Sequence, residues 1–114
     1  MRPAAIILAA LIAVAATDAL ADPTLTLTLR EHRFTPSSLT APTGRKVTIV
    51  VINRDPSPVS FRIWGLNVGM TLAPRGRENL DIGPLKAGAY HFVDELHAQS
   101  AKGVIAARPG AKPG

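Results

Sequence analysis

Hydrophobic and polar residues alternate along much of the chain beyond residue 22, with the two-residue period of β-strands. The clearest case is segment 24–30, where Leu and Thr alternate up to Arg30. Because successive side chains of a strand point to opposite faces, we expect the leucines to face a core and the threonines to face solvent. Segment 45–52 carries four Val and Ile residues in its second half, which is typical of a central strand.

Other short extended segments follow at intervals of ~8–12 residues, separated by Pro and Gly. These strand candidates are 37–40, 59–63, 77–82, 89–93 and 102–107. No segment beyond residue 22 has a convincing helical period. The pattern therefore predicts an all-β fold, a Greek-key β-sandwich of about seven strands. Residues 64–70 fit no period, and Trp64 is expected to fill the core, as large apolar side chains usually do.

Tyr90 follows a Gly-containing turn by two residues, a spacing that fits a tyrosine corner. In such a corner the hydroxyl bonds to nearby backbone, so we interpret Tyr90 as structural. By parity Tyr90 and Phe92 share the core face, while His91 and Val93 point the other way.

The first residues have the features of a secretory signal. Arg2 precedes an uncharged apolar run over 4–16, which is shorter than the ~20 residues of a membrane-spanning helix. Ala19-Leu20-Ala21 fits a cleavage site. We therefore predict a signal peptide at 1–21, a single domain at 22–108 and a disordered Pro/Gly/Lys-rich tail at 109–114.

Composition narrows the possible functions. The sequence has no Cys, which excludes disulfides, thiol redox chemistry and Cys-based zinc sites. The net charge of +5 comes from scattered basic residues rather than a cluster interleaved with aromatics, so nucleic acid is not an expected partner. The charge is consistent with solubility, or with peripheral attraction to an anionic membrane or acidic protein. No hydrolase motif or phosphate-binding glycine loop occurs, and an enzymatic role is not favoured.

Several short motifs, taken in order, resemble a known family. They are Phe34-Thr35-Pro36, the segments 42–47 and 53–58, the segment 83–92, and Glu95-Leu96-His97 continuing to Gly103-Val104. Together they resemble the EfeO-type cupredoxin-like domain over about residues 25–107. The resemblance implies a small bacterial periplasmic protein with a cupredoxin fold. It also implies association with iron uptake through a high-affinity permease and a metal-binding role, often with copper.

The chain departs from the cupredoxin pattern at the metal ligands. A blue-copper site needs two His, a Cys thiolate and usually an axial Met. Val59 or Ser60 stands about where the first His falls, and Ala101 lies near the place of the axial Met. Without a thiolate, type 1 copper and blue-copper electron transfer are excluded.

His97 is the best candidate metal ligand, because it lies in the loop that carries the C-terminal His of cupredoxins. Glu95 lies two residues earlier and would share its face if the strand continued, as a ligand or as an orienting partner. Met70 and His91 are weaker candidates. Asp94 should point the opposite way and is interpreted as structural, and His32 has no recognisable partner in the sequence.

Two hypotheses of different classes follow. In the first, the protein is a periplasmic accessory of iron or copper handling that binds one copper or iron ion through His97 and Glu95. In the second, the sandwich binds no metal and is an interaction module that docks on an iron permease or another envelope protein, with its positive charge steering it to an acidic partner.

Overall fold

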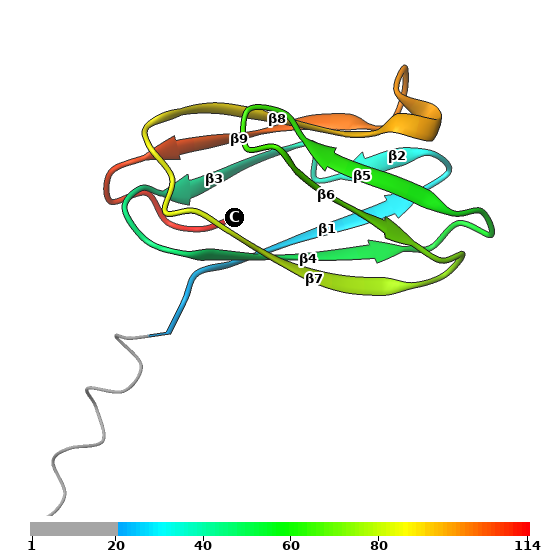
Figure 1. The fold of residues 1–114 in the computed structure, drawn as a ribbon, viewed down its shortest axis with the longest axis horizontal. Helices are drawn as coiled ribbons and strands as arrows, with labels where there is room; N and C mark the ends of the chain where they lie inside the picture. Colours follow the sequence, from blue (N-terminus) through cyan, green and yellow to red (C-terminus); the bar gives the residue numbers. More distant parts are fainter. Residues whose placement is uncertain (1–20) are drawn as a thin grey trace, which may run out of the picture.

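The computed structural model describes residues 21–114, so the predicted signal peptide lies almost entirely outside the described residues. Nine strands and one short 3₁₀ segment make up this part of the chain (Figure 1). The elements are β1 (Thr24–Arg30), β2 (Arg33–Thr35), β3 (Ser38–Pro42), β4 (Val47–Asn53), β5 (Val59–Ile63), β6 (Val68–Leu72), β7 (Arg77–Ile82), β8 (Gly88–Asp94), η2 (Glu95–His97) and β9 (Lys102–Arg108).

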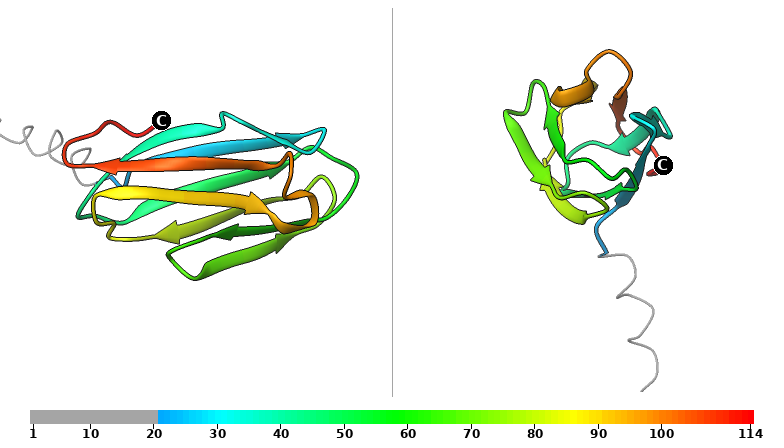
Figure 2. Two further views of the ribbon diagram at one scale, coloured as in Figure 1. Left: turned by 90° about the horizontal axis from the view of Figure 1, so that it is seen from above. Right: turned by 90° about the vertical axis from the view of Figure 1, so that its right-hand side faces the viewer.

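The strands form two sheets packed face to face, as the two views of Figure 2 show. One sheet has the order β2-β1-β4-β7, and the other has the order β3-β9-β8-β5-β6. The predicted all-β sandwich is confirmed, and β4 lies inside its sheet as expected. The strand count is nine rather than seven, because β2 has only three residues and β6 contains Gly69. A Cβ at Gly69 would lie 2.8 Å from the Phe61 carbonyl oxygen, so this close strand contact needs a glycine, which hides the strand pattern.

Alternation along the strands fills the space between the sheets. Leu25, Leu27 and Leu29 of β1 are buried while the neighbouring threonines lie outward, as predicted. Three phenylalanines bring the sheets together, with Phe34 edge-on to both Phe61 and Phe92 at ring-centroid distances of 5.8 and 5.1 Å. Their burial anchors the sandwich, because each buried aromatic removes a large apolar surface from water.

Trp64 does not join this core, and the expectation that it would is wrong. Its exposed fraction is 58%, because β5 ends at Ile63 and the next residues turn outward over Gly65, whose φ is +89°. Three phenylalanines already fill the centre. Trp64 is therefore on the surface of the molecule.

Tyr90 forms the predicted corner. Its hydroxyl donates to the Lys86 carbonyl at 2.7 Å, which ties β8 to the turn before it. Phe92 is buried, and Tyr90 packs partly buried against the same core, whereas His91 is exposed. Val93, expected on the outer face, lies there but is buried by its surroundings.

The last residues lie along the outer side of β3. Thr40 and Gly114 exchange two backbone hydrogen bonds of 3.0 Å, although the composition of this tail favoured disorder. In the part of the chain described, no helix is long and apolar enough to cross a membrane.

Candidate metal centre

Four side chains from distant parts of the sequence meet at one end of the sandwich. This end carries the β1–β2 turn, the loop after β4 and the segment after β8, all on the right in Figure 1. The side chains form a row, Asp55, His32, His97 and Asp94, with the two imidazoles in the middle. His32 lies in the β1–β2 turn of one sheet, and Asp94 and His97 lie at the end of β8 in the other. Asp55 lies in the loop between β4 and β5, which connects the two sheets.

Asp55 holds the β1–β2 turn in place. Its two carboxylate oxygens accept the backbone N–H of Glu31 at 2.6 Å and of His32 at 2.9 Å. Both turn residues have positive φ, +53° and +57°, which suits a tight two-residue hairpin but is uncommon for residues other than Gly, and most unfavourable here for Glu31. The carboxylate therefore stabilises a strained turn and fixes the position of His32.

Two opposing effects set the pKa of Asp55: burial on one side, and hydrogen bonds and neighbouring charges on the other. Desolvation raises this pKa, because the side chain is buried. The backbone N–H groups of His32 and Glu31, followed by the imidazoles of His32 and His97, lower it by more in total. The net result is a pKa below the ordinary value, so the carboxylate is ionised at neutral pH.

Asn53 holds the backbone of Asp55 in place. Its buried amide donates to the carbonyls of Ser57 at 2.8 Å and Ala73 at 3.0 Å, and its side-chain oxygen accepts the Asp55 N–H at 3.0 Å. One buried side chain thus fixes the whole β4–β5 loop. Such a fully bonded buried amide is costly to replace, because its partners would lose their hydrogen bonds.

Asp94 plays the matching part in the other sheet and is fully buried, as its predicted structural role requires. One oxygen accepts the N–H of Ser60 at 3.0 Å and, as the cap of η2, the N–H of Leu96 at 3.1 Å. The other lies 3.1 Å from Nδ1 of His97. Because a carboxylate only accepts, Nδ1 donates and Nε2 of the neutral ring keeps its lone pair.

The two imidazoles stack face to face. The ring centroids of His32 and His97 are 3.6 Å apart and the planes differ by 13°. Nδ1 of His32 lies 3.5 Å from an oxygen of Asp55, which is too long for a hydrogen bond, and among the described residues this buried nitrogen has no hydrogen-bond partner. Each ring thus turns Nδ1 toward a buried carboxylate.

Glu95 is engaged elsewhere. Its two carboxylate oxygens bond Oγ of Ser60 and Nε of Arg62, both at 3.1 Å. The chain leaves β8 at Asp94 and enters a 3₁₀ turn, so the strand parity that would place Glu95 beside His97 does not continue. Glu95 as a metal ligand, with His97, stays a prediction, and the local contacts favour Asp94 as the carboxylate that orients His97.

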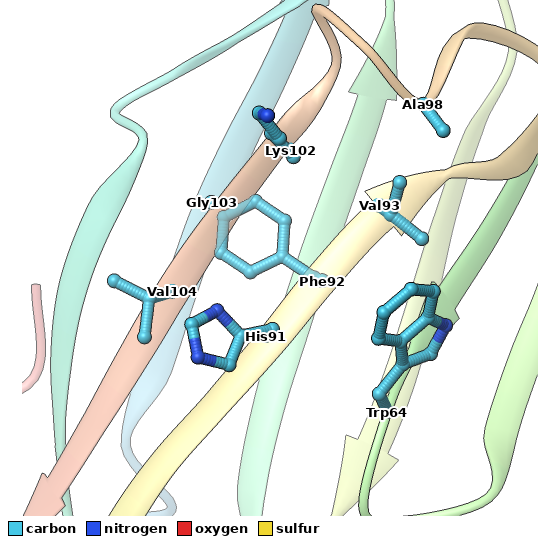
Figure 3. A pocket seen from close by; sticks show the side chains of 8 residues that line it. All are labelled: Trp64, His91, Phe92, Val93, Ala98, Lys102, Gly103 and Val104. Carbon is cyan, nitrogen blue, oxygen red and sulfur yellow. The ribbon is translucent and has the colours of Figure 1, made fainter.

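Asp55, His32, His97 and Asp94 form the end cluster, and the weaker candidate metal ligands lie away from it. Met70, on the edge strand β6, is the register partner of Phe61 and packs partly buried against the core. His91 lines a hollow of about 640 Å³ on the outer face of β8 and β9. Figure 3 shows Trp64 at one side of this hollow, with Val93, Ala98 and Val104 among its lining residues and Lys102 at its rim.

No group of three or more His, Cys, Asp or Glu side chains is arranged to hold a metal ion in residues 21–114. His32 and Asp55 are not predicted as site residues from the sequence, because neither has a partner nearby in sequence. Strand β2, which begins at Arg33, is not among the strands expected from the sequence, and it is this strand that makes Glu31 and His32 a two-residue turn after Arg30. A two-residue hairpin turn places His32 at the same end as the loops after β4 and β8.

Comparison with known families is consistent with this architecture. The profile of the family described as Cupredoxin-like domain matches residues 3–107, which is most of the chain. The chain belongs to this family. The narrower resemblance to the EfeO-type domain stays a prediction.

Solved structures share the fold at low sequence identity. Auracyanin from Roseiflexus castenholzii superposes with a TM-score of 0.64 and 16% identity, over 78% of this chain and 99% of that one. A copper-binding protein in its apo form gives 0.65 and 18%, over 75% and 86%. The metal-binding domain of the Cu(I)-exporting ATPase CopA of Streptococcus pneumoniae gives 0.66 and 11%, over 75% and 84%. These likenesses establish the cupredoxin fold.

Among curated proteins, the uncharacterized protein RP394 of Rickettsia prowazekii is 27% identical over 79 residues. The match covers 69% of this chain and 63% of RP394, so the chain spans less than two thirds of that relative.

The copper ion that the fold implies can be tested against the donors at this end. A type 1 site does not fit, because the chain has no thiolate. Val59, near the usual first-His position, is buried, and the Ser60 N–H is bound by Asp94. The donors that fit copper are imidazole nitrogens, and His32 and His97 supply two.

Proposed function

We propose that this protein is a periplasmic accessory protein of metal handling that binds one copper ion through His97 and His32. The proposal follows from the cupredoxin fold and from one local observation. The Nδ1 atom of each stacked imidazole faces a buried carboxylate, Asp94 for His97 and Asp55 for His32. Histidines that ligate metals commonly present one nitrogen to a carboxylate in this way, which fixes the tautomer and raises the basicity of the other nitrogen.

The free nitrogen of His97 is Nε2, because Nδ1 donates to Asp94, whereas Nδ1 of His32 has no hydrogen-bond partner among the described residues. In the stack the two rings are nearly parallel, so their in-plane lone pairs do not converge on one point. Binding a single ion through both rings requires one ring to turn out of the stack. His32 is the ring that can turn, because its side chain is 42% exposed and has no hydrogen bond at Nδ1 among the described residues.

Copper is the favoured metal on the chemistry of the donors. Nitrogen sites bind Cu(II) more tightly than Fe(II) or Zn(II), so imidazoles without carboxylate ligands prefer copper to ferrous iron. When bound, the ion would supply redox or Lewis-acid chemistry, and the chain would hold and orient it. Iron handling remains part of the proposal through the family resemblance, with an iron permease as the partner.

The test is a Cu(II) titration of the purified protein followed by electron paramagnetic resonance. We expect one saturable site with nitrogen hyperfine splitting. His97→Ala and His32→Ala should each weaken binding at least tenfold, because even the loss of a group that only orients a metal ligand costs about 10–100-fold in affinity. His91→Ala is the matched control, because it removes an exposed imidazole away from the cluster.

Glu95→Gln separates this site from the alternative in which Glu95 is a ligand. Both Glu95 oxygens already bond other side chains, so affinity should change less than about twofold, the effect of a surface pair alone. If Glu95→Gln and His97→Ala lower affinity while His32→Ala does not, the ligand pair is His97 and Glu95. If no variant alters binding, the end cluster is not a metal site.

The exposed Trp64 favours a second candidate function, docking on an acidic envelope protein. Trp64 and valines line the hollow of Figure 3, and Lys102 and His91 add positive or polar groups to it. An apolar side chain flanked by carboxylates is complementary to such a surface. Trp64 is the only tryptophan in the chain, so a blue shift of its emission on adding a soluble acidic domain of a candidate permease tests docking directly.

A further inference from the structure

Four arginines gather at the same end of the sandwich, on the outer side of the sheet β2-β1-β4-β7. Arg30 ends β1, Arg54 follows β4, Arg75 lies in the loop after β6, and Arg77 begins β7. They line a hollow of about 280 Å³ together with Ile52 and Asn53. We propose that this arginine hollow binds a phosphate-type oxyanion.

No carboxylate of the described residues neutralises the four guanidinium groups. Within residues 21–114, none of the four has a carboxylate within the distance of an ion pair. Four like charges around one hollow repel each other, and this repulsion is relieved when an anion enters. A guanidinium offers several donors in a planar fork that matches phosphate oxygens in pairs.

Asp81, an acidic side chain of the same strand as Arg77, lies at the far end of this face. Asp81 is four residues along β7 from Arg77, which is ~13 Å at the usual rise of a strand. It accepts from Thr48 Oγ1 at 2.8 Å and lies 3.8 Å from Lys46. Four arginines therefore line one end of this sheet, while Asp81 is paired with Lys46 at the other end.

The hollow is partly preorganised. Arg75 has a φ of +60°, its N–H donates to the Asp55 carbonyl at 3.0 Å, and its guanidinium donates to the Arg54 carbonyl at 3.1 Å. Asn53, whose side chain is fully bonded, lies at the base. A ligand that meets a side chain already held in place loses less conformational entropy on binding.

A multivalent oxyanion fits better than a single carboxylate. Four cations around one hollow can share the several oxygens and the double negative charge of phosphate, whereas one carboxylate would satisfy two forks at most. The phosphate can be free inorganic phosphate or the headgroup of an anionic lipid, and the two sources share the same chemistry.

Isothermal titration of the purified protein with inorganic phosphate, at constant ionic strength, tests the site. We expect saturable one-site binding that weakens at least tenfold in the double variant Arg54→Gln/Arg77→Gln. The matched control is Arg108→Gln/Lys112→Gln, which removes the same charge from exposed positions that do not line the hollow and should leave affinity within threefold. Thermal unfolding of each variant verifies that it is folded.

Vesicle sedimentation distinguishes the two sources. Capture on phosphatidylglycerol but not phosphatidylcholine vesicles, lost in Arg54→Gln/Arg77→Gln, assigns a lipid headgroup. Phosphate binding without vesicle capture assigns free phosphate. The proposal is overturned if neither probe binds, if both double variants lose affinity equally, or if only an acidic peptide binds.

Discussion

The imidazole of His32 stacks on that of His97 with 3.6 Å between ring centroids, and the contact joins the two sheets of the sandwich at one end. His32 is fixed by the turn that Asp55 holds, and His97 is fixed by its bond to Asp94. The stack therefore has a buried carboxylate on each side. This arrangement connects the fold to the proposed metal site, because the groups that position the rings are also those that stabilise the loops.

Asp55→Asn should destabilise the protein at neutral pH. The amide can replace only one acceptor oxygen and brings an NH₂ group against the second N–H of the turn, so we expect a loss of about 1–3 kcal/mol in the free energy of unfolding. Urea unfolding measures it. Asp81→Asn is the control, because its carboxylate is exposed and should matter by less than about 1 kcal/mol.

The stabilisation that Asp55 provides should also depend on pH, and a comparison of the wild type with Asp55→Asn measures this dependence. The folded pKa of Asp55 is lowered, so its stabilisation is present above the unfolded value of ~3.9 and is lost as the pH falls through the folded pKa. The difference in stability between the wild type and Asp55→Asn should thus be constant from pH 7 to about pH 5 and shrink below about pH 4. A difference that stays the same at pH 3 would contradict the lowered pKa.

The fold could be predicted from the sequence because its signals are local. Leu25, Leu27 and Leu29 alternate with threonines, and the Tyr90 corner depends on residues only four apart. The site could be predicted only in part. The loop position of His97 predicts it as a site residue, but its partners His32 and Asp55 come from a distant turn and loop, and no local pattern specifies which loops meet at one end of a sandwich.

The surroundings of Glu95 and of Trp64 differ from those expected from the sequence, and both differences have local physical reasons. The interpretation of Glu95 assumed that β8 continues past Asp94, whereas the Asp94 side chain caps a 3₁₀ turn and rotates Glu95 toward Arg62. Trp64 was assigned to the core from its size alone. The size of a side chain indicates how much its burial would stabilise the fold. The end of β5 at Ile63 decides which way the Trp64 side chain points.

Trp64→Ala should barely change stability, in contrast to Phe61→Ala. Trp64 is 58% exposed, so its removal should cost no more than about 1 kcal/mol, whereas Phe61 is 1% exposed and its loss should cost about 3–5 kcal/mol. Denaturant unfolding followed by circular dichroism compares the two. A Trp64→Ala cost close to that of Phe61→Ala would show that the indole is buried.

Tyr90→Phe should remove one hydrogen bond and little else. The ring keeps its partly buried position while the Lys86 carbonyl loses its donor, so we expect a loss of about 0.5–1.5 kcal/mol. Urea unfolding gives the value. Copper affinity should be unchanged, because the corner lies at the start of β8 and the end cluster lies at and beyond its other end. A change in affinity would show that the corner positions the ligand loop.

Gly103→Ala is expected to be the most damaging single-methyl change on β9. A Cβ at this position would overlap the ring of Phe92 and the carbonyl oxygen of Ser37, and neither can move without displacing its own strand contacts. Phe92 is the register partner of Gly103 and is 1% exposed, so the ring has no free volume to enter. Overpacking of this kind costs about 1–3 kcal/mol, and more when backbone must shift.

Ala89→Val is the control, because it adds carbons at an exposed position on the neighbouring strand and should change stability by less than about 0.5 kcal/mol. Thermal unfolding of the two variants decides the matter, and equal midpoints would mean that Phe92 can adopt another rotamer.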